Sequence, residues 1–378
     1  MGDIDLRFLL DPTTLATIVA LLAFAYTILI GSRTIPEWLA EQRKRSDEKA
    51  KQKSHPSPDA PHPPSQVTHS AFTGTVLYRE DHRLTTVACS PDGEYVAFGG
   101  FSQRVYVLSL ATSQVEIGES HTGIIRSVHF RSSGDAVVSA ADDGLVKVTS
   151  FRHKELMIPG RHDGPVYSAA FHPSEELIAS AGKDGVIRLW DLARAPIFRP
   201  GSDASKVITN APVTVMRNAK GAVFAIAFDK TGKTLASGGV DGSVALWDLP
   251  TGSPRYLTGF AHTVFSVCFH PDGEHVAAGA SDGTIRLWNL KANSCRLLVG
   301  HLDTARWLAF APAGDLLVSA SKDRTLRVWE LASERSWVLD GHQDYVYGVA
   351  FRPSGDRILS VAGDGTLRLW PVPPFNQR

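Results

Sequence analysis

Histidine, serine and aspartate, the side chains of a hydrolytic triad, recur together along this 378-residue chain. A base, a nucleophile and an orienting carboxylate are the groups that cleave esters and amides. A catalytic site needs one such set, and repetition of the set favours a structural role. We therefore assign no catalytic residue. Three complete sets, each followed by a tryptophan, are His162, Ser180, Asp184 and Trp190; His301, Ser319, Asp323 and Trp329; and His342, Ser360, Asp364 and Trp370.

Two other enzyme motifs are present only in part. Residues 227–234 fit a loose phosphate-binding loop, but the first glycine is missing and a strand pattern follows where the motif needs a helix. Residues 279–283 spell a nucleophile elbow, again without a following helix. The fourteen histidines show no metal-ligand spacing beyond the repeat itself. We predict no enzyme activity, no cofactor and no metal site.

One pattern organises the chain: an Asp-Gly turn followed by an alternating strand that ends on tryptophan. Its clearest copy runs from Lys183 to Leu192. The turn positions are 102, 143, 184, 241, 282, 323 and 364, spaced by 41 residues except for one interval of 57. A period of about 40 to 45 residues is typical of the four-stranded blades of a propeller.

On these repeats the sequence resembles the WD-repeat β-propeller family over about residues 72 to 371. The resemblance implies an all-β fold, a seven-bladed propeller of four-stranded blades. It implies that each complete His, Ser, Asp and Trp set forms a buried hydrogen-bond chain, whereas copies one, two, four and five lack members of the set. It also implies that an N-terminal strand completes the last blade, and residues 73–79 have the pattern for this role.

The first 70 residues lie outside the repeats and divide into three segments, before a propeller at 71–378. An acidic leader, residues 1–11, precedes residues 12–32, an uncharged apolar segment that as a transmembrane helix would span a bilayer. Residues 33–70 hold a basic juxtamembrane stretch and a proline-rich linker. The alternatives are a cleaved signal peptide and a buried core helix, but the leader is not basic and an all-β propeller offers no helical layer.

Basic side chains flank the apolar segment unequally, because seven Lys or Arg residues follow it closely and one precedes it. Such asymmetry indicates that the following side is cytoplasmic. The three cysteines, Cys89, Cys268 and Cys295, are interpreted as small core residues in a reducing compartment. We expect a single-pass membrane protein with its propeller on the cytoplasmic side.

Charge argues against a nucleic-acid partner, since the chain carries 39 basic and 39 acidic side chains and no global positive field. No small-molecule substrate is evident. We expect a scaffold that binds one or more protein partners. Two alternatives stay open: a regulatory or exchange factor acting through a loop, and an extracytoplasmic sensor. The long interval contains 57 − 41 = 16 extra residues, which place the candidate loop at about residues 193–212.

The resemblance also implies where a partner binds, because in this family the first strand of each repeat lines the central channel. Residues near the start of that strand open on the face that carries the Asp turns. Aromatic and arginine side chains, which are enriched in interface hot spots, gather at these positions. We expect a protein-binding face that includes Phe101, Arg126, Tyr167, Lys183, Phe224, Phe265, Arg306, Tyr345 and Tyr347.

Overall fold

A computed structural model of the chain describes residues 67–70, 74–118, 120–198, 214–217, 221–333 and 335–373. These residues belong to one compact unit that spans residues 61–378. The predicted transmembrane segment at 12–32, the leader and most of the linker lie outside the described residues. Within the described ranges, no helix has the length and apolar character that crossing a membrane requires.

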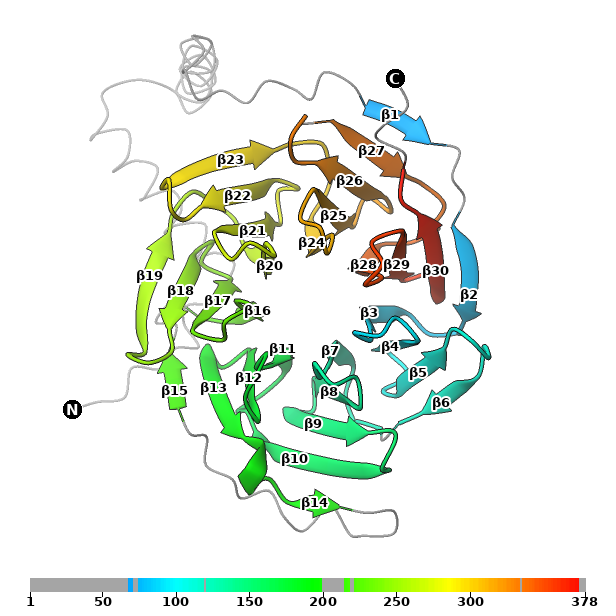
Figure 1. Cartoon of the computed structure of the whole chain (residues 1–378), viewed down its shortest axis with the longest axis vertical. Coiled ribbons are helices and arrows are strands. Elements are labelled where there is room, and N and C mark those ends of the chain that lie inside the picture. Colours follow the sequence, from blue (N-terminus) through cyan, green and yellow to red (C-terminus); the bar gives the residue numbers. More distant parts are fainter. Residues whose placement is uncertain are drawn as a thin grey trace, which may run out of the picture. The chain divides into compact units, whose positions relative to one another are not determined.

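Seven sheets arranged in a ring form the fold (Figure 1). In each blade, consecutive strands lie progressively farther from the centre, so the predicted all-β, seven-bladed propeller is confirmed. Blades one to three contain β3 (Leu84–Cys89), β4 (Tyr95–Gly100), β5 (Val105–Ser109) and β6 (Val115–Ile117); β7 (Ile125–Phe130), β8 (Ala136–Ala141), β9 (Leu145–Ser150) and β10 (Glu155–Arg161); and β11 (Val166–Phe171), β12 (Leu177–Gly182), β13 (Val186–Asp191) and β15 (Thr214–Arg217).

The same four-stranded plan continues through the C-terminal half. Blades four to six contain β16 (Val223–Phe228), β17 (Thr234–Gly239), β18 (Val244–Asp248) and β19 (Ser253–Leu257); β20 (Val264–Phe269), β21 (His275–Ala280), β22 (Ile285–Asn289) and β23 (Ser294–Leu298); and β24 (Ala305–Phe310), β25 (Leu316–Ser321), β26 (Leu326–Glu330) and β27 (Ser336–Leu339). Blade seven contains β28 (Val346–Phe351), β29 (Arg357–Ala362), β30 (Thr366–Pro371) and β2 (Thr75–Arg79).

Strand β2 closes the ring. It pairs antiparallel with β30, with Thr75 opposite Leu369 and Arg79 opposite Thr366. The preceding Gly74 lies directly against the indole of Trp370, where an added Cβ would come within 2.5 Å of a ring carbon. The expectation that an N-terminal strand completes the last blade is therefore confirmed, with the strand starting at Thr75 instead of residue 73.

Two blades carry a fifth, short edge strand that the sequence does not predict. Strand β1 (Val67–Ser70) runs parallel to β27, so the last four residues assigned to the linker form an edge strand of blade six. Strand β14 (Ile197–Phe198), at the start of the long interval, pairs antiparallel with β10 of blade two. Both strands satisfy backbone groups at an otherwise open sheet edge.

The core lies between neighbouring blades. Alternating apolar side chains cover both faces of each sheet, so successive blades share one hydrophobic cluster. Between blades five and six, for example, Ile285 and Leu287 pack in one cluster with Leu308 and Trp329. This arrangement buries apolar residues on every inner and middle strand, whereas among the outer strands β10 and β27, which β14 and β1 cover, are more buried than strands such as β19.

Hydrogen-bond chains connect the loops of complete blades to this core. In blade six, Trp329 Nε1 donates to Ser319 Oγ at 2.9 Å, and Ser319 Oγ lies 2.7 Å from His301 Nε2. His301 Nδ1 lies 2.8 Å from the carboxylate of Asp323. The network assigns the ring proton to Nδ1, so every member has a partner. The same bonds link His162, Ser180, Asp184 and Trp190 in blade three and His342, Ser360, Asp364 and Trp370 in blade seven.

Burial and hydrogen bonding determine the protonation states of the histidine and the aspartate in these hydrogen-bond chains. It lowers the pKa of His301, which stays neutral although Asp323 opposes the shift. Burial alone would raise the pKa of Asp323, but the hydrogen bond from His301 and those from the turn hold that pKa well below its usual range. A neutral imidazole bonded to an ionised carboxylate thus joins each His loop to its Asp turn.

Blades that lack a member of the set keep only part of the chain. In blade four Trp247 Nε1 donates to Ser237 Oγ at 2.8 Å, and no histidine of the described residues bonds that hydroxyl. Blade one instead packs aromatic rings: Phe98 lies 5.2 Å from Tyr106 and 5.0 Å from Tyr78 of β2, centroid to centroid. The Tyr106 hydroxyl also donates to Glu80 at 2.7 Å, so ring packing and this one bond replace the His, Ser, Asp and Trp chain in blade one.

These two kinds of blade give a matched test of the chain. Ser319→Ala leaves two buried groups, His301 Nε2 and Trp329 Nε1, without partners, whereas Ser237→Ala leaves only Trp247 Nε1. At about 1 to 3 kcal/mol per unsatisfied group, Ser319→Ala should lower the free energy of unfolding by about twice as much. Chemical denaturation of both variants measures the difference, and equal losses would contradict a cooperative role for the histidine.

Ring closure predicts how the chain responds to shortening. Removing residues 1–73 deletes β1 but keeps β2, and should lower the melting temperature only slightly. Removing residues 1–81 also deletes β2, exposes the edge of β30 and unpacks Tyr78 from Phe98, and should lower it by about 5 °C or more. Calorimetry of the two shortened chains measures this; if both melt at the same temperature and with the same cooperativity, β2 does not hold the ring.

Candidate protein-binding face

Each of the seven inner strands contains a β-bulge at its second residue. In blade three, Val166 pairs with Gly182 and Ser168 pairs with Ala181, so Tyr167 has no partner on β12. A bulge removes a residue from the regular alternation and redirects its side chain. The seven bulged residues, here called the bulge ring, are Thr85, Arg126, Tyr167, Phe224, Phe265, Arg306 and Tyr347.

Six of the nine residues expected on the binding face belong to the bulge ring, and the structure brings neighbours together across blade boundaries. Tyr167 stacks on Phe224 with a centroid distance of 4.9 Å and an interplanar angle of 19°. Phe224 lies 4.8 Å from Phe265, and the guanidinium of Arg306 lies 4.9 Å above the ring of Phe265. Blades three to six therefore present one continuous platform of three rings and a cation.

The two arginines of the bulge ring have different environments. Arg126 donates from Nε and Nη2 to the carboxylate of Asp142, at 2.7 and 2.5 Å, in a bidentate ion pair. Arg306 is half-buried, and burial together with the charge of Arg126 lowers its pKa to about 10. Arg306 therefore remains protonated at neutral pH, but it is less well solvated than a surface arginine.

The other three expected residues lie in loops outside the ring. Phe101 is 37% exposed beside Arg83, Tyr345 is 40% exposed beside Lys322, and Lys183 is exposed. Leu302, which follows His301 in the same loop system, is 91% exposed and is not among the nine expected residues. Its signal was available, because among the four copies with a histidine at the usual place, copies two, three and seven have Thr122, Asp163 and Gln343 after it and only copy six has a large apolar residue.

A cavity of about 510 Å³ lies at the other end of the inner strands and is lined by side chains that include Cys89, Cys268 and Trp307. Burial raises the pKa of Cys89 to about 11 and raises that of Cys268, so both thiols are protonated and weakly nucleophilic. The interpretation of the cysteines as core residues is wrong for Cys295, which is exposed, while Cys89 and Cys268 are half-buried in the cavity wall.

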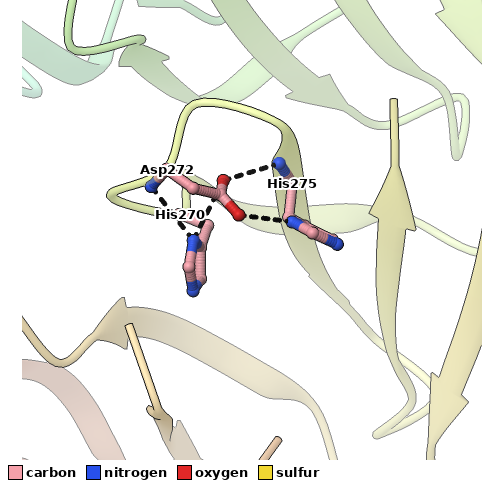
Figure 2. A group of neighbouring side chains, drawn as sticks. All are labelled: His270, Asp272 and His275. Atoms are coloured by element: carbon pink, nitrogen blue, oxygen red, sulfur yellow. Dashed lines mark hydrogen bonds and ion pairs between the residues drawn. The ribbon is translucent and has the colours of Figure 1, made fainter. Parts of the chain in front are cut away.

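Two histidines and one aspartate converge on the hairpin between β20 and β21 and have the side-chain types of a metal site (Figure 2). Asp272 places its carboxylate oxygens 3.0 Å from His270 Nδ1 and 2.7 Å from His275 Nδ1. A metal ion would need a free lone pair on each of these nitrogens. The surrounding hydrogen bonds decide whether those lone pairs are available.

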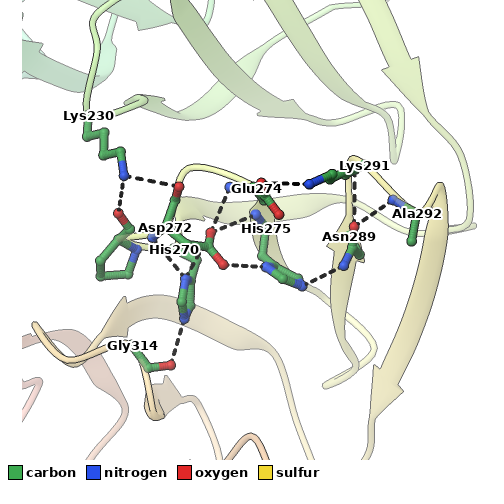
Figure 3. Close-up of polar contacts among 10 residues, drawn as sticks. Lys230, His270, Asp272, Glu274, His275, Asn289, Lys291, Ala292 and Gly314 are labelled. Carbon is green, nitrogen blue, oxygen red and sulfur yellow. Dashed lines mark hydrogen bonds and ion pairs between the residues drawn. The ribbon is translucent and has the colours of Figure 1, made fainter.

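The neighbours of the group engage both imidazoles (Figure 3). The amide nitrogen of Asn289 donates to His275 Nε2 at 3.0 Å, which places the proton of His275 on Nδ1, facing Asp272. His270 Nδ1 accepts the backbone N–H of Asp272, while its Nε2 donates to the carbonyl of Gly314 in blade six at 2.6 Å. The group therefore acts as a hydrogen-bonded clasp between blades five and six, and we assign it no metal.

Comparison with known proteins agrees with this architecture. The family model described as WD domain, G-beta repeat matches residues 113–150, 154–191, 210–248, 254–289, 293–330 and 333–371, more than half of the chain. Two curated relatives are apoptotic protease-activating factor 1 from Rattus norvegicus and from Mus musculus, each 26% identical, over 84 and 81 residues. Those matches cover 22% and 21% of this chain but only 7% and 6% of the relatives, so they bear on the repeats alone.

Six matched repeats and a seventh blade, which lacks the His, Ser, Asp and Trp chain, account for the seven sheets. A propeller of this kind is suited to protein–protein interaction, and its bulge ring and exposed loop residues offer the chemistry of such an interface. The chain belongs to the WD-repeat family.

Proposed function

We propose that this protein is a scaffold without catalytic activity that is anchored in a membrane and binds a protein partner on the face that surrounds the bulge ring. The observation that carries the proposal is the platform of Tyr167, Phe224, Phe265 and Arg306, which four blades build from side chains that are only half-buried. Aromatic and arginine side chains on a rigid scaffold lose little conformational entropy on binding.

The exposed apolar residues support the same face. Phe101, Val240, Leu302 and Tyr345 lie in loops next to the Asp turns, whereas the other large exposed apolar side chains of the described residues lie on or beside outer strands. Exposed apolar groups with a polar surround are typical of protein-binding surfaces. The bulge ring and these loop residues together form a candidate interface with an aromatic centre.

The absence of catalysis is proposed from the state of the polar groups. Ser180, Ser319 and Ser360, the hydroxyls that resemble triad nucleophiles, are fully buried and bonded to both a tryptophan and a histidine. A substrate cannot reach them without unfolding the blade. The cavity thiols are protonated at neutral pH.

The membrane anchor is proposed from the sequence of residues 12–32 and the cytoplasmic position from the basic residues that follow. Two alternative functions remain, and each requires one particular feature of the chain. A regulatory or exchange factor would act through residues 193–212, of which Ile197 is 57% exposed, and an extracytoplasmic sensor would require the reverse orientation.

Topology can be tested in sealed vesicles of known orientation. Protease added to the cytoplasmic side should digest the propeller, because the basic flank places residues 33–378 on that side. Immunoblotting with an antibody against the propeller measures its survival. Digestion only from the opposite side would support the extracytoplasmic sensor and contradict the proposed location.

The binding face can be tested by combining Phe101→Ala, Tyr345→Ala and Leu302→Ser in the full chain. These side chains are exposed, so the melting temperature should change little, while recovery of a partner from solubilised membranes should fall by about tenfold or more. Quantitative mass spectrometry of co-purified proteins measures the loss.

A control for this variant is Ile197→Ser, which removes an exposed apolar side chain from β14 and leaves the candidate face intact. It should retain the partner. Loss of the partner in Ile197→Ser with retention in the triple variant would contradict the proposed face and favour residues 193–212.

A further inference from the structure

Arg306 of the bulge ring is a cation without an acceptor. The described residues supply no hydrogen bond or ion pair to its guanidinium, whose one specific contact is the ring of Phe265 at 4.9 Å. Arg126, at the equivalent position of blade two, donates from Nε and Nη2 to the carboxylate of Asp142. A guanidinium presents five donors, and a half-buried one without acceptors is a costly arrangement for folding alone.

The charges in the bulge ring favour a ligand group with one negative charge at Arg306. Arg126 and Asp142 cancel, so the bulge ring keeps a single positive charge at Arg306. The Tyr167 and Tyr347 hydroxyls, which lie near enough to influence its pKa, form no hydrogen bond within the described part of the chain and are further potential donors. Planar guanidinium and carboxylate groups bond through two parallel N–H···O contacts.

Partial burial strengthens the hydrogen bonds that Arg306 can donate to an anion. Burial and the charge of Arg126 lower the pKa of Arg306 to about 10, which still leaves the guanidinium protonated at pH 7. A charge-assisted hydrogen bond in such an environment is stronger than one in open solvent. The rings of Phe265, Phe224 and Tyr167 extend from the cation in one direction and offer an apolar surface beside it.

We infer that Arg306 binds the carboxylate of an Asp or Glu side chain that a protein partner inserts into the mouth of the channel, with apolar residues of the same segment lying on Phe265 and Phe224. The inference rests on the proposed function and adds the chemistry of the recognised segment. Within the bulge ring Arg306 is the one cation to which the described residues give no acceptor, and its single charge matches that of a carboxylate.

The test uses a random peptide library displayed on phage and selected on the full chain in lipid nanodiscs. Peptides that bind the wild type should share an acidic residue at one position. Replacing that residue by Gln or Asn, or making Arg306→Gln in the protein, should each weaken binding by about tenfold or more, and the two changes together should weaken it no further. Arg306→Lys, which keeps the charge but loses the fork, should fall between.

Controls separate binding from folding. Calorimetry should show that Arg306→Gln and Arg306→Lys melt as cooperatively as the wild type. Arg255→Gln, which removes an exposed arginine from β19 at the outer edge of blade four, should not weaken any selected peptide.

Three outcomes would contradict the inference or its basis. Peptides that depend on Tyr345 and Phe101 but carry no shared acidic residue and bind Arg306→Gln normally would overturn the carboxylate site and leave the proposed function standing. Phosphoserine at the shared position binding at least tenfold more tightly than Asp or Glu would overturn the choice of a carboxylate. A selection that returns no peptide sensitive to Tyr345→Ala or Phe101→Ala would contradict the proposed function itself.

Discussion

The pairing of β2 with β30 is the constraint on which the rest of the propeller depends. It joins two segments from opposite ends of the repeats and places Tyr78 against the rings of blade one. The cluster formed there contains Leu84 and Val87 of blade one with Leu359 and Leu367 of blade seven. Since each sheet is covered on both faces by its neighbours, an open ring would expose two apolar faces at once. Closure therefore stabilises every blade.

A closed ring also fixes the starts of the seven inner strands around one channel. Each of those strands shifts register at the same point, so the bulge is a property of the backbone plan and not of any one side chain. The side chains that occupy it differ in chemistry: one threonine, two arginines, two tyrosines and two phenylalanines. The backbone pairing at the bulge is thus the same in all seven blades. The side chains at the bulge, where a partner would make contact, differ from blade to blade.

The sequence predicts the blades well because the features that form them are local in the sequence. The Asp-Gly turns, the alternating strands and the spacing of His301, Ser319, Asp323 and Trp329 all report local geometry, and the structure contains the corresponding turns, strands and bonds. Edge strands β1 and β14 could not be predicted, because a segment of four or two residues pairs there in response to an open edge on β27 or β10.

The candidate site could be predicted in position but not in geometry. The repeat places Tyr167 and Phe224 near the channel, yet no local pattern reports that they are bulged or that their rings stack at 4.9 Å. Contacts between blades join residues 41 to 57 positions apart, as in the ring pairs of Tyr167 with Phe224 and of Phe224 with Phe265. Arg126 and Asp142 lie in one blade, yet their pairing, and the lack of such a partner for Arg306 among the described residues, emerge only in three dimensions.

The contrast between those two arginines bears on why a stable scaffold keeps a cation that finds no acceptor among the described residues. Contact with Phe265 offsets part of the burial cost of Arg306, at about 0.5 to 2 kcal/mol for a cation over a ring. It leaves the donor edge of the guanidinium unused. A cation held on a rigid platform loses little entropy when an acceptor arrives, so the proposed interaction would discriminate strongly between partners that supply a carboxylate and those that do not. The arrangement is unfavourable for the isolated fold and favourable for recognition, which is the expected signature of a binding residue.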